Sequence, residues 1–189
     1  MSRVIYSTAT TFDGYIADPS DSLDWLFAVP DAAEAEAGIT EFLGRVGVLV
    51  EGSTTHEWVV THEKLAESPE RWAQFYGDRP TFVFTRRMRD AVPGADIRFR
   101  SGSVTEVWPE ILDTAGGRDV WIVGGGDLAG QFADAGLLDE IVLSVAPVAL
   151  GSGRALLPRR LESDRLRLTG IRRVGQFAEL TYAVDNSRR

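Results

Sequence analysis

The chain has 189 residues, 44% of them hydrophobic, and a formal net charge of −8 at pH 7. This composition is typical of a soluble globular protein, and we expect one domain over residues 1–185 followed by a frayed polar tail at 186–189. The acidic balance argues against nucleic acid or an anionic membrane as the partner. The absence of cysteine excludes disulfides and thiolate sites, and the presence of only two histidines excludes an imidazole-rich metal site. The sequence shows neither a signal-peptide pattern nor an apolar run of membrane-spanning length, so we expect a cytoplasmic protein.

Strand and helix patterns alternate as far as residue 136. The strands are short runs of β-branched and aromatic residues, and the helices repeat apolar residues at a spacing of three or four. In chain order we predict a strand at 3–9, a turn-containing segment at 11–17, a helix at 31–45, a strand at 46–50, a helix that starts after Gly52, a surface excursion at 61–79 with a short helix at 70–76, and strands at 80–85 and 97–100.

The next helix is predicted over residues 103–115 and ends at Gly116. It contains Pro109, which a helix tolerates only in its first turn. Pro109 is therefore awkward in the interior of this helix unless Thr105 is the N-cap, which would place the proline in the first turn.

The segment 120–128 reads as a buried strand, three consecutive glycines and a helix start, and the helix is predicted over residues 127–135. Glycines bring no side chains to a core, so we interpret them as permitting a sharp turn and a close approach to the main chain. A helix start directs free N–H groups at such a gap, which suits an anion such as a cofactor phosphate. A tight turn without a ligand is the alternative.

The remainder of the chain predicts strands only, at 141–148, 166–174 and 177–184, with Gly175 and Gln176 as a hairpin turn between the last two. The whole pattern predicts an α/β fold. Its sheet is mostly parallel, with antiparallel C-terminal strands.

Three predicted strand ends carry glycine-rich or polar loops: Gly52-Ser53-Thr54-Thr55, Thr85-Arg86-Arg87, and Gly124-Gly125-Gly126-Asp127. In a parallel sheet such ends meet at one edge, where ligands bind. The helix starts suit the phosphates of a dinucleotide, although a hydroxyl of Ser53, Thr54 or Thr55 is equally suited to cap its own helix. Arg86 suits a ribose 2′-phosphate and favours NADPH over NADH. A solvated basic turn is the alternative for Arg86.

The run from Gly124 to Ala129 also matches the G-x-G-x-x-A form of the Rossmann fingerprint. We reject an ordinary Rossmann domain, because the short remainder of the chain reads as mainly antiparallel strands.

No activated nucleophile is visible in the sequence, so acids near the 12–25 loop are the candidates for handling a proton. Each has a structural alternative: Asp13 as a turn residue, Asp24 as a cap, and Asp31 as an N-terminal helix residue. Trp25 and Phe27 suit the wall of a pocket for a flat heterocycle.

These residues together resemble the dihydrofolate reductase-like superfamily, in particular the RibD C-terminal domain group and its stand-alone members. The most specific segments of the resemblance are 11–17, 120–132 and 136–157. The resemblance implies a central, mostly parallel sheet with helices on both faces, NADPH across the strand ends, and hydride transfer to a pteridine- or pyrimidine-like substrate. It also implies a homodimer with the C-terminal strands as the interface.

By motif, the resemblance places Gly124, Gly125, Gly126 and Leu128 beside the cofactor pyrophosphate and nicotinamide. It matches Thr55 to a family threonine, Thr85 and Arg86 to the pair that meets the adenosine phosphate, and Ala9 and Ile16 to the nicotinamide pocket. Gly52, Ser53 and Asp127 complete the predicted cofactor residues, and Asp13, Trp25 and Phe27 are the predicted substrate residues.

The chain departs from the family pattern at Ser53 and His56, where a basic residue and an aromatic residue are often found. Asp31 stands six residues after Trp25, the spacing of the pterin-binding acid in dihydrofolate reductases, and is the candidate catalytic residue. The separate deaminase domain of the bifunctional riboflavin enzyme is missing from this sequence. We therefore expect an NADPH-dependent reductase for a pteridine, a pyrimidine or another small heterocycle or imine. The alternative is a non-catalytic nucleotide-binding module with the same fold.

Overall fold

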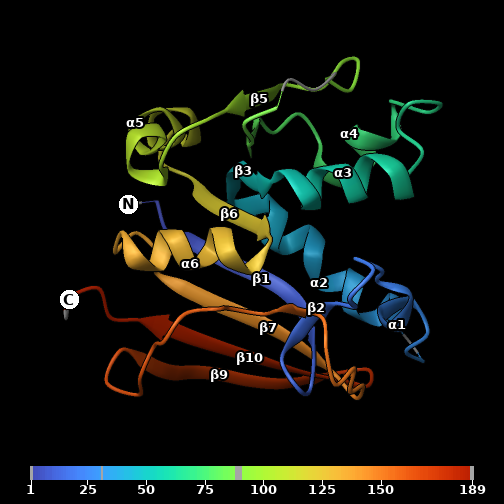
Figure 1. Ribbon diagram of the computed structural model, residues 1–189, viewed down its shortest axis with the longest axis vertical. Coiled ribbons are helices and arrows are strands. Elements are labelled where there is room, and N and C mark those ends of the chain that lie inside the picture. Colours follow the sequence, from blue (N-terminus) through green and yellow to red (C-terminus); the bar gives the residue numbers. More distant parts are fainter. Residues whose placement is uncertain (1, 31, 88–90, 188–189) are drawn as a thin grey trace.

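The computed structural model describes residues 2–30, 32–87 and 91–187, and for residues 32–38 it describes the backbone alone. An eight-stranded sheet of order β5-β4-β3-β6-β1-β7-β10-β9 runs through the molecule (Figure 1). Its strands are β1 (Val4–Thr11), β3 (Val46–Gly52), β4 (Thr81–Phe84), β5 (Ile97–Arg100), β6 (Asp119–Gly124), β7 (Glu140–Ala146), β9 (Leu166–Val174) and β10 (Phe177–Val184). Neighbours from β5 to β7 pair in parallel, whereas β10 pairs antiparallel with both β7 and β9. The predicted mostly parallel sheet with antiparallel C-terminal strands is confirmed.

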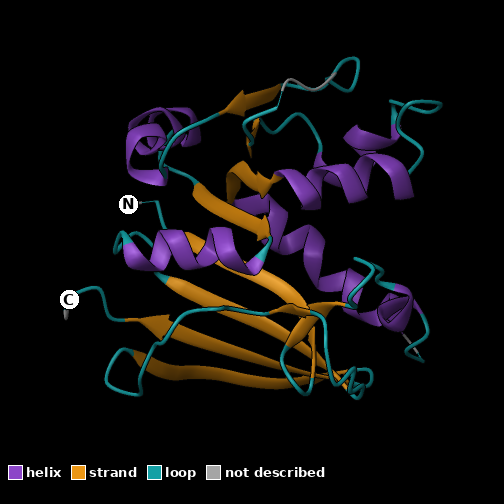
Figure 2. Cartoon of the chain, viewed as in Figure 1, coloured by secondary structure: helices purple, strands orange, loops and turns teal. Residues whose placement is uncertain are grey.

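Helices cover both faces of this sheet (Figure 2). They are α1 (Asp24–Phe27), α2 (Ala32–Arg45), α3 (Ser53–His62), α4 (Arg71–Tyr76), α5 (Val104–Ala115) and α6 (Gly126–Asp134). Successive side chains of β3 point to opposite faces. Val48 and Val50 join the main core under α5 and α6, whereas Leu49 packs with Phe42 of α2. The side of the sheet that carries α2, α3 and α4 therefore has its own smaller cores.

The helix predicted at 103–115 is confirmed as α5, Val104–Ala115, and its N-cap shows how Pro109 is accommodated. Ser103, not Thr105, caps α5, because its hydroxyl accepts from the N–H of Glu106 while the Glu106 carboxylate accepts from the N–H of Ser103. This capping box outweighs the unfavourable interior position that it gives Pro109. Gly116 ends the helix in the left-handed conformation, with a φ of 58°, as predicted.

The hydroxyls after β3 do not cap their helix. Gly52 is the N-cap of α3 and no side chain accepts a capping hydrogen bond there. The segment 61–79, predicted as a surface excursion, also contributes to a small hydrophobic core. Its residues Leu65 and Trp72 are almost fully buried in a cluster with Val59 and Val92. A short pairing of β2 (Tyr15–Ala17) with β8 (Arg154–Ala155) was not predicted, since two residues give no readable period.

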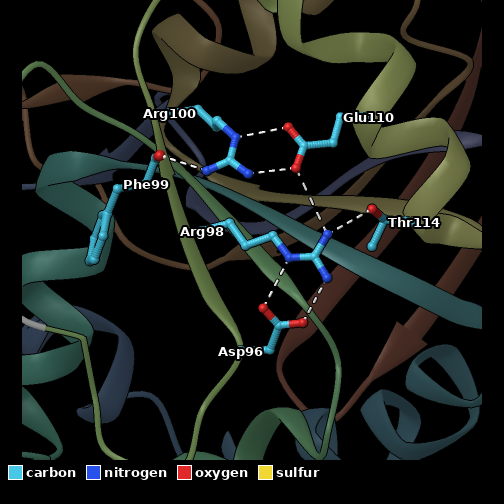
Figure 3. Close-up of polar contacts among 6 residues, drawn as sticks. All are labelled: Asp96, Arg98, Phe99, Arg100, Glu110 and Thr114. Carbon is cyan, nitrogen blue, oxygen red and sulfur yellow. Dashed lines mark hydrogen bonds and ion pairs between the residues drawn. The ribbon is translucent and has the colours of Figure 1, made fainter.

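The edge strand β5 is fastened to α5 by two arginines (Figure 3). Arg98 donates to both carboxylate oxygens of Asp96 and to the hydroxyl of Thr114, and Arg100 donates to both carboxylate oxygens of Glu110. These contacts tie the edge strand β5 to α5, and they place charged side chains at this edge of the sheet.

In the described part of the chain, no helix combines the length and apolarity needed to span a membrane. Near the C-terminus, the side-chain amide of Asn186 donates to the carbonyl of Leu138 at 2.9 Å.

Candidate functional site

A cavity of about 1300 Å³ opens at the edge of the sheet where β3 and β6 end. Its wall there consists of the starts of α3 and α6, namely Gly52, Ser53, Thr54, Thr55, Gly124, Gly125, Gly126, Asp127 and Leu128. The structure thus brings together two of the three loops that the sequence singled out. Their role in binding a cofactor stays a prediction.

The two loops touch through glycine and threonine. A Cβ added to Gly124 would lie 3.2 Å from Thr55 Oγ1, and one added to Gly125 would lie 3.7 Å from the same atom. A Cβ on Gly52 would lie 3.6 Å from the backbone nitrogen of Gly125. Side chains at these glycines would fill the place where the two helix starts converge, so the cavity depends on their absence.

Gly126 has a different reason to be glycine. A Cβ there would collide with the carbonyl oxygens of Ala155 and Leu156, whose backbone crosses the first turn of α6. At Gly126 the close approach to the main chain that the glycines permit is thus made by the protein's own backbone.

Asp127 brings a negative charge to the start of α6, and that charge is compensated. Its carboxylate accepts from Gln131 Nε2 at 2.9 Å and from Arg159 Nη2 at 3.0 Å. The hydrogen bond from Gln131, followed by the contact with Arg159, lowers the pKa of Asp127. Arg159 also pairs with Asp134 at 2.7 Å, so this arginine ties the segment after β8 to α6.

Ala9 and Ile16, the predicted nicotinamide residues, line the same cavity. Ile16 Cδ1 lies 3.7 Å from the position of a Cβ on Gly125. Ala9 on β1 is the register partner of Ser144 on β7. The end of β1 therefore lies between the glycine loop and the C-terminal strands.

Trp25 and Phe27 line the cavity as well, beside an aromatic stack that the sequence did not predict. Phe27 stacks on His62 with ring centroids 5.1 Å apart, and His62 stacks on Trp58 at 4.4 Å. Trp58 and His62 are four residues apart on α3, the spacing that places side chains on one face of a helix. This spacing in the sequence could have indicated that Trp58 and His62 lie together. No local pattern indicated that Phe27 of α1 would pack against them.

Asp13 serves the backbone. Its carboxylate accepts from the Thr11 hydroxyl at 2.5 Å, from the N–H of Leu150 at 3.0 Å and from the N–H of Gly151 at 2.7 Å. The bond from Thr11, helped by those from the two amides, lowers the pKa of Asp13. Asp13 is not among the described residues that line the cavity, so its predicted contact with substrate has no geometric support.

Thr85 and Arg86 follow β4 and are not among the described lining residues either, although Phe84 before them is. The hydroxyl of Thr85 accepts from the N–H of Arg87 at 3.1 Å. They lie at the same edge as the glycine loops, because Phe84 is the register partner of Gly52. Asp31, the predicted catalytic acid, lies outside the described residues.

One buried pair behind the cavity wall had no signal in the sequence. Glu51, at the end of β3, is fully buried, and its Oε2 lies 3.0 Å from Nδ1 of His56, which is 3% exposed. Glu51 Oε1 and His56 Nε2 are buried without a hydrogen-bond partner. The pair joins the strand end to the first turns of α3 from within.

The family model named RibD C-terminal domain matches residues 2–178. The chain belongs to the RibD C-terminal domain family. Among curated proteins, it is 28% identical over 180 residues to the Uncharacterized protein YwjB of Bacillus subtilis strain 168, covering 95% of this chain and 97% of that one.

Solved structures of RibD proteins share the fold. A putative riboflavin biosynthesis protein from Shewanella sp. PV-4 superposes with a TM-score of 0.77 at 25% identity, over 97% of this chain and 99% of that one. A diaminohydroxyphosphoribosylaminopyrimidine deaminase/5-amino-6-(5-phosphoribosylamino)uracil reductase from Thermotoga maritima gives a TM-score of 0.68 at 13% identity, and the match covers 97% of this chain and 57% of that one. The fold is thus the dihydrofolate reductase-like fold of RibD reductases.

Proposed function

We propose that this RibD-family protein is an NADPH-dependent reductase that transfers a hydride to a pteridine-like, pyrimidine-like or other small heterocyclic or imine substrate. The observation that carries the proposal is the convergence of two helix starts, at Ser53 and Gly126, on one cavity at the carboxyl edge of a parallel sheet. Edges of this kind bind dinucleotides, and the family includes reductases.

The residues fit such a cofactor. Free N–H groups of residues 53–55 and 126–128 suit its phosphates, and Gly52, Gly124 and Gly125 leave the space that a Cβ would fill. Arg86 at the same edge favours the extra phosphate of NADPH. The bound nicotinamide supplies the hydride. Ala9 and Ile16 would border it, while Trp25 and Phe27 would exclude water and orient the substrate.

The direct test is binding followed by turnover. Sub-millimolar NADPH should raise the melting temperature and quench tryptophan fluorescence, because Trp25, Trp58 and Trp121 line the cavity. The preference for NADPH over NADH should fall in Arg86→Gln. A screen of pteridines, ribosylaminopyrimidines and small imines for NADPH oxidation should then identify a substrate class. A protein that binds neither cofactor would refute the proposal.

The alternative of a non-catalytic nucleotide-binding module rests on Ser53, which carries no positive charge toward a phosphate. Cofactor binding without oxidation by any compound in the screen would favour it.

A further inference from the structure

The cavity has a second lobe that the cofactor site does not need. Beyond Ala9 the cavity lining continues with residues of β7, β10 and β9. These C-terminal strands lie side by side in the sheet (Figure 1). The pairing register of the strands places four residues in a row across the sheet. Ala9 pairs with Ser144, Ser144 with Glu179, and Glu179 with Arg172. The lobe therefore begins at the predicted nicotinamide residue and ends at an ion pair on the last strands.

Hydroxyl groups and ion pairs make up the polar part of this floor. Ser7 on β1, Ser144 on β7 and Thr181 on β10 line it. Such groups both donate and accept hydrogen bonds and suit uncharged partners with hydroxyl, amide or ring nitrogen groups.

The two arginines that the strands place on this floor, Arg172 and Arg3, are paired with carboxylates, whereas Arg45 of α2 lines the same cavity and lies over the ring of Phe42. Arg172 donates to both oxygens of Glu179, at 2.5 and 3.0 Å, and this contact raises the pKa of Arg172. Glu41 of α2 adds a second negative charge near it. Arg3, further along the floor, pairs with Glu140 at 3.1 Å and Asp119 at 3.0 Å.

A phosphate monoester carries between one and two negative charges at neutral pH and binds where arginines are free to form paired hydrogen bonds with it. On this floor it would meet Glu179 beside Arg172, and Glu140 beside Arg3. Like charges within a few ångströms disfavour such a ligand, whereas an uncharged ligand of the same shape meets no such repulsion.

Resting on the proposed reductase function, we propose that this lobe holds an uncharged, hydroxyl-bearing planar heterocycle and excludes its phosphorylated form. Glu179 is the residue that sets this specificity, because it occupies the guanidinium that a phosphate would otherwise bind.

Riboflavin and its 5′-phosphate, FMN, form a matched pair of probes, since both are planar heterocycles with a hydroxylated chain and they differ by one phosphate. Binding is measured from flavin fluorescence with saturating NADP⁺, which keeps the cofactor phosphate positions occupied. Wild-type protein should bind riboflavin about tenfold or more tightly than FMN. Glu179→Gln should strengthen FMN binding by about tenfold and leave riboflavin within about threefold, because Arg172 is released while the shape is kept.

Glu162→Gln is the matched control, because Glu162 pairs with Arg160 on an exposed loop outside the cavity lining and the net charge changes equally. It should leave both affinities unchanged. The proposal is overturned if wild-type protein prefers FMN, if neither probe binds, or if Glu162→Gln has the same effect as Glu179→Gln. NADP⁺ binding is measured first. If NADP⁺ does not bind, the proposed cofactor function is refuted, but the comparison of riboflavin with FMN in the absence of NADP⁺ still tests the specificity of the lobe.

Discussion

The hydroxyl oxygen of Thr55 lies 3.2 Å from the position that a Cβ would take on Gly124, so the two helix starts that face the cavity are in contact. Neither loop can move toward the other without closing the space between them. This contact links the geometry of the predicted phosphate site to the identity of a single glycine.

Gly124→Ala should therefore displace Thr55 by a few tenths of an ångström and weaken NADPH binding by about tenfold, with a loss of about 1–2 kcal/mol in unfolding free energy. Fluorescence titration and urea denaturation measure the two effects. Gly44→Ala in α2 is the control, because nothing lies within 4 Å of its added Cβ. It should stabilise the protein by about 0.5–1 kcal/mol without changing the affinity. Equal affinity for NADPH in the two variants would contradict the proposal that the two helix starts form one phosphate site.

The buried Glu51–His56 pair predicts non-additive stability changes. His56→Leu leaves a fully buried carboxyl group without a partner and should destabilise the protein by about 3 kcal/mol. The double variant Glu51→Leu/His56→Leu should recover most of this loss, because it leaves no buried polar group behind. A double-mutant cycle in urea measures the coupling, and additive effects would show that the two side chains do not depend on each other.

Asp13 predicts a dependence on pH. Its folded-state pKa is lowered, so its contribution to stability is present above the ordinary carboxyl pKa of about 4 and is lost as the pH falls through the lower folded value. Asp13→Asn should lower the melting temperature at neutral pH. The difference from wild type should shrink as the pH falls below about 4. A difference that stays constant across this range would mean that the charge of Asp13 is not what holds the amides of Leu150 and Gly151.

The C-terminal strands carry the surface on which we propose that a second copy packs to form a homodimer. Ile171 and Leu168 on the edge strand β9 are 72% and 51% exposed. They share a face, because they are the partners of Leu180 and Tyr182, which are two residues apart on β10. Ile171→Asp should convert a dimer to a monomer in analytical ultracentrifugation, while Leu112→Asp, at an exposed apolar position of α5, should not. A monomeric wild-type protein would refute this proposal.

The sequence was most informative where structure is local. The glycines at 124–126 and the polar residues after β3 marked two strand ends correctly, because backbone turns and helix starts depend on the residues that form them. The helix at 103–115 was also predicted, but the cap at Thr105 that would have moved Pro109 into the first turn is not formed, because the capping box at Ser103 starts the helix earlier.

What could not be predicted depends on which strands and helices become neighbours. The contact of Glu51 with His56 crosses a strand–helix boundary and has no periodic signal. The stacking of Phe27 on His62 requires that α1 packs against α3. The row from Ser144 to Arg172 exists only through the pairing register of β10, which no single segment encodes.

Gly126 has one further consequence. The backbone of Ala155 and Leu156 rests directly on it, and Pro158, two residues further on, forms part of the cavity wall. A side chain at Gly126 would lift this crossing segment, which Tyr6 holds from below through a hydrogen bond of 3.0 Å to the carbonyl of Leu156. The smallest residue of the first turn of α6 thus sets how closely this part of the cavity wall packs against the helix, and with it the width of the cavity beside α6.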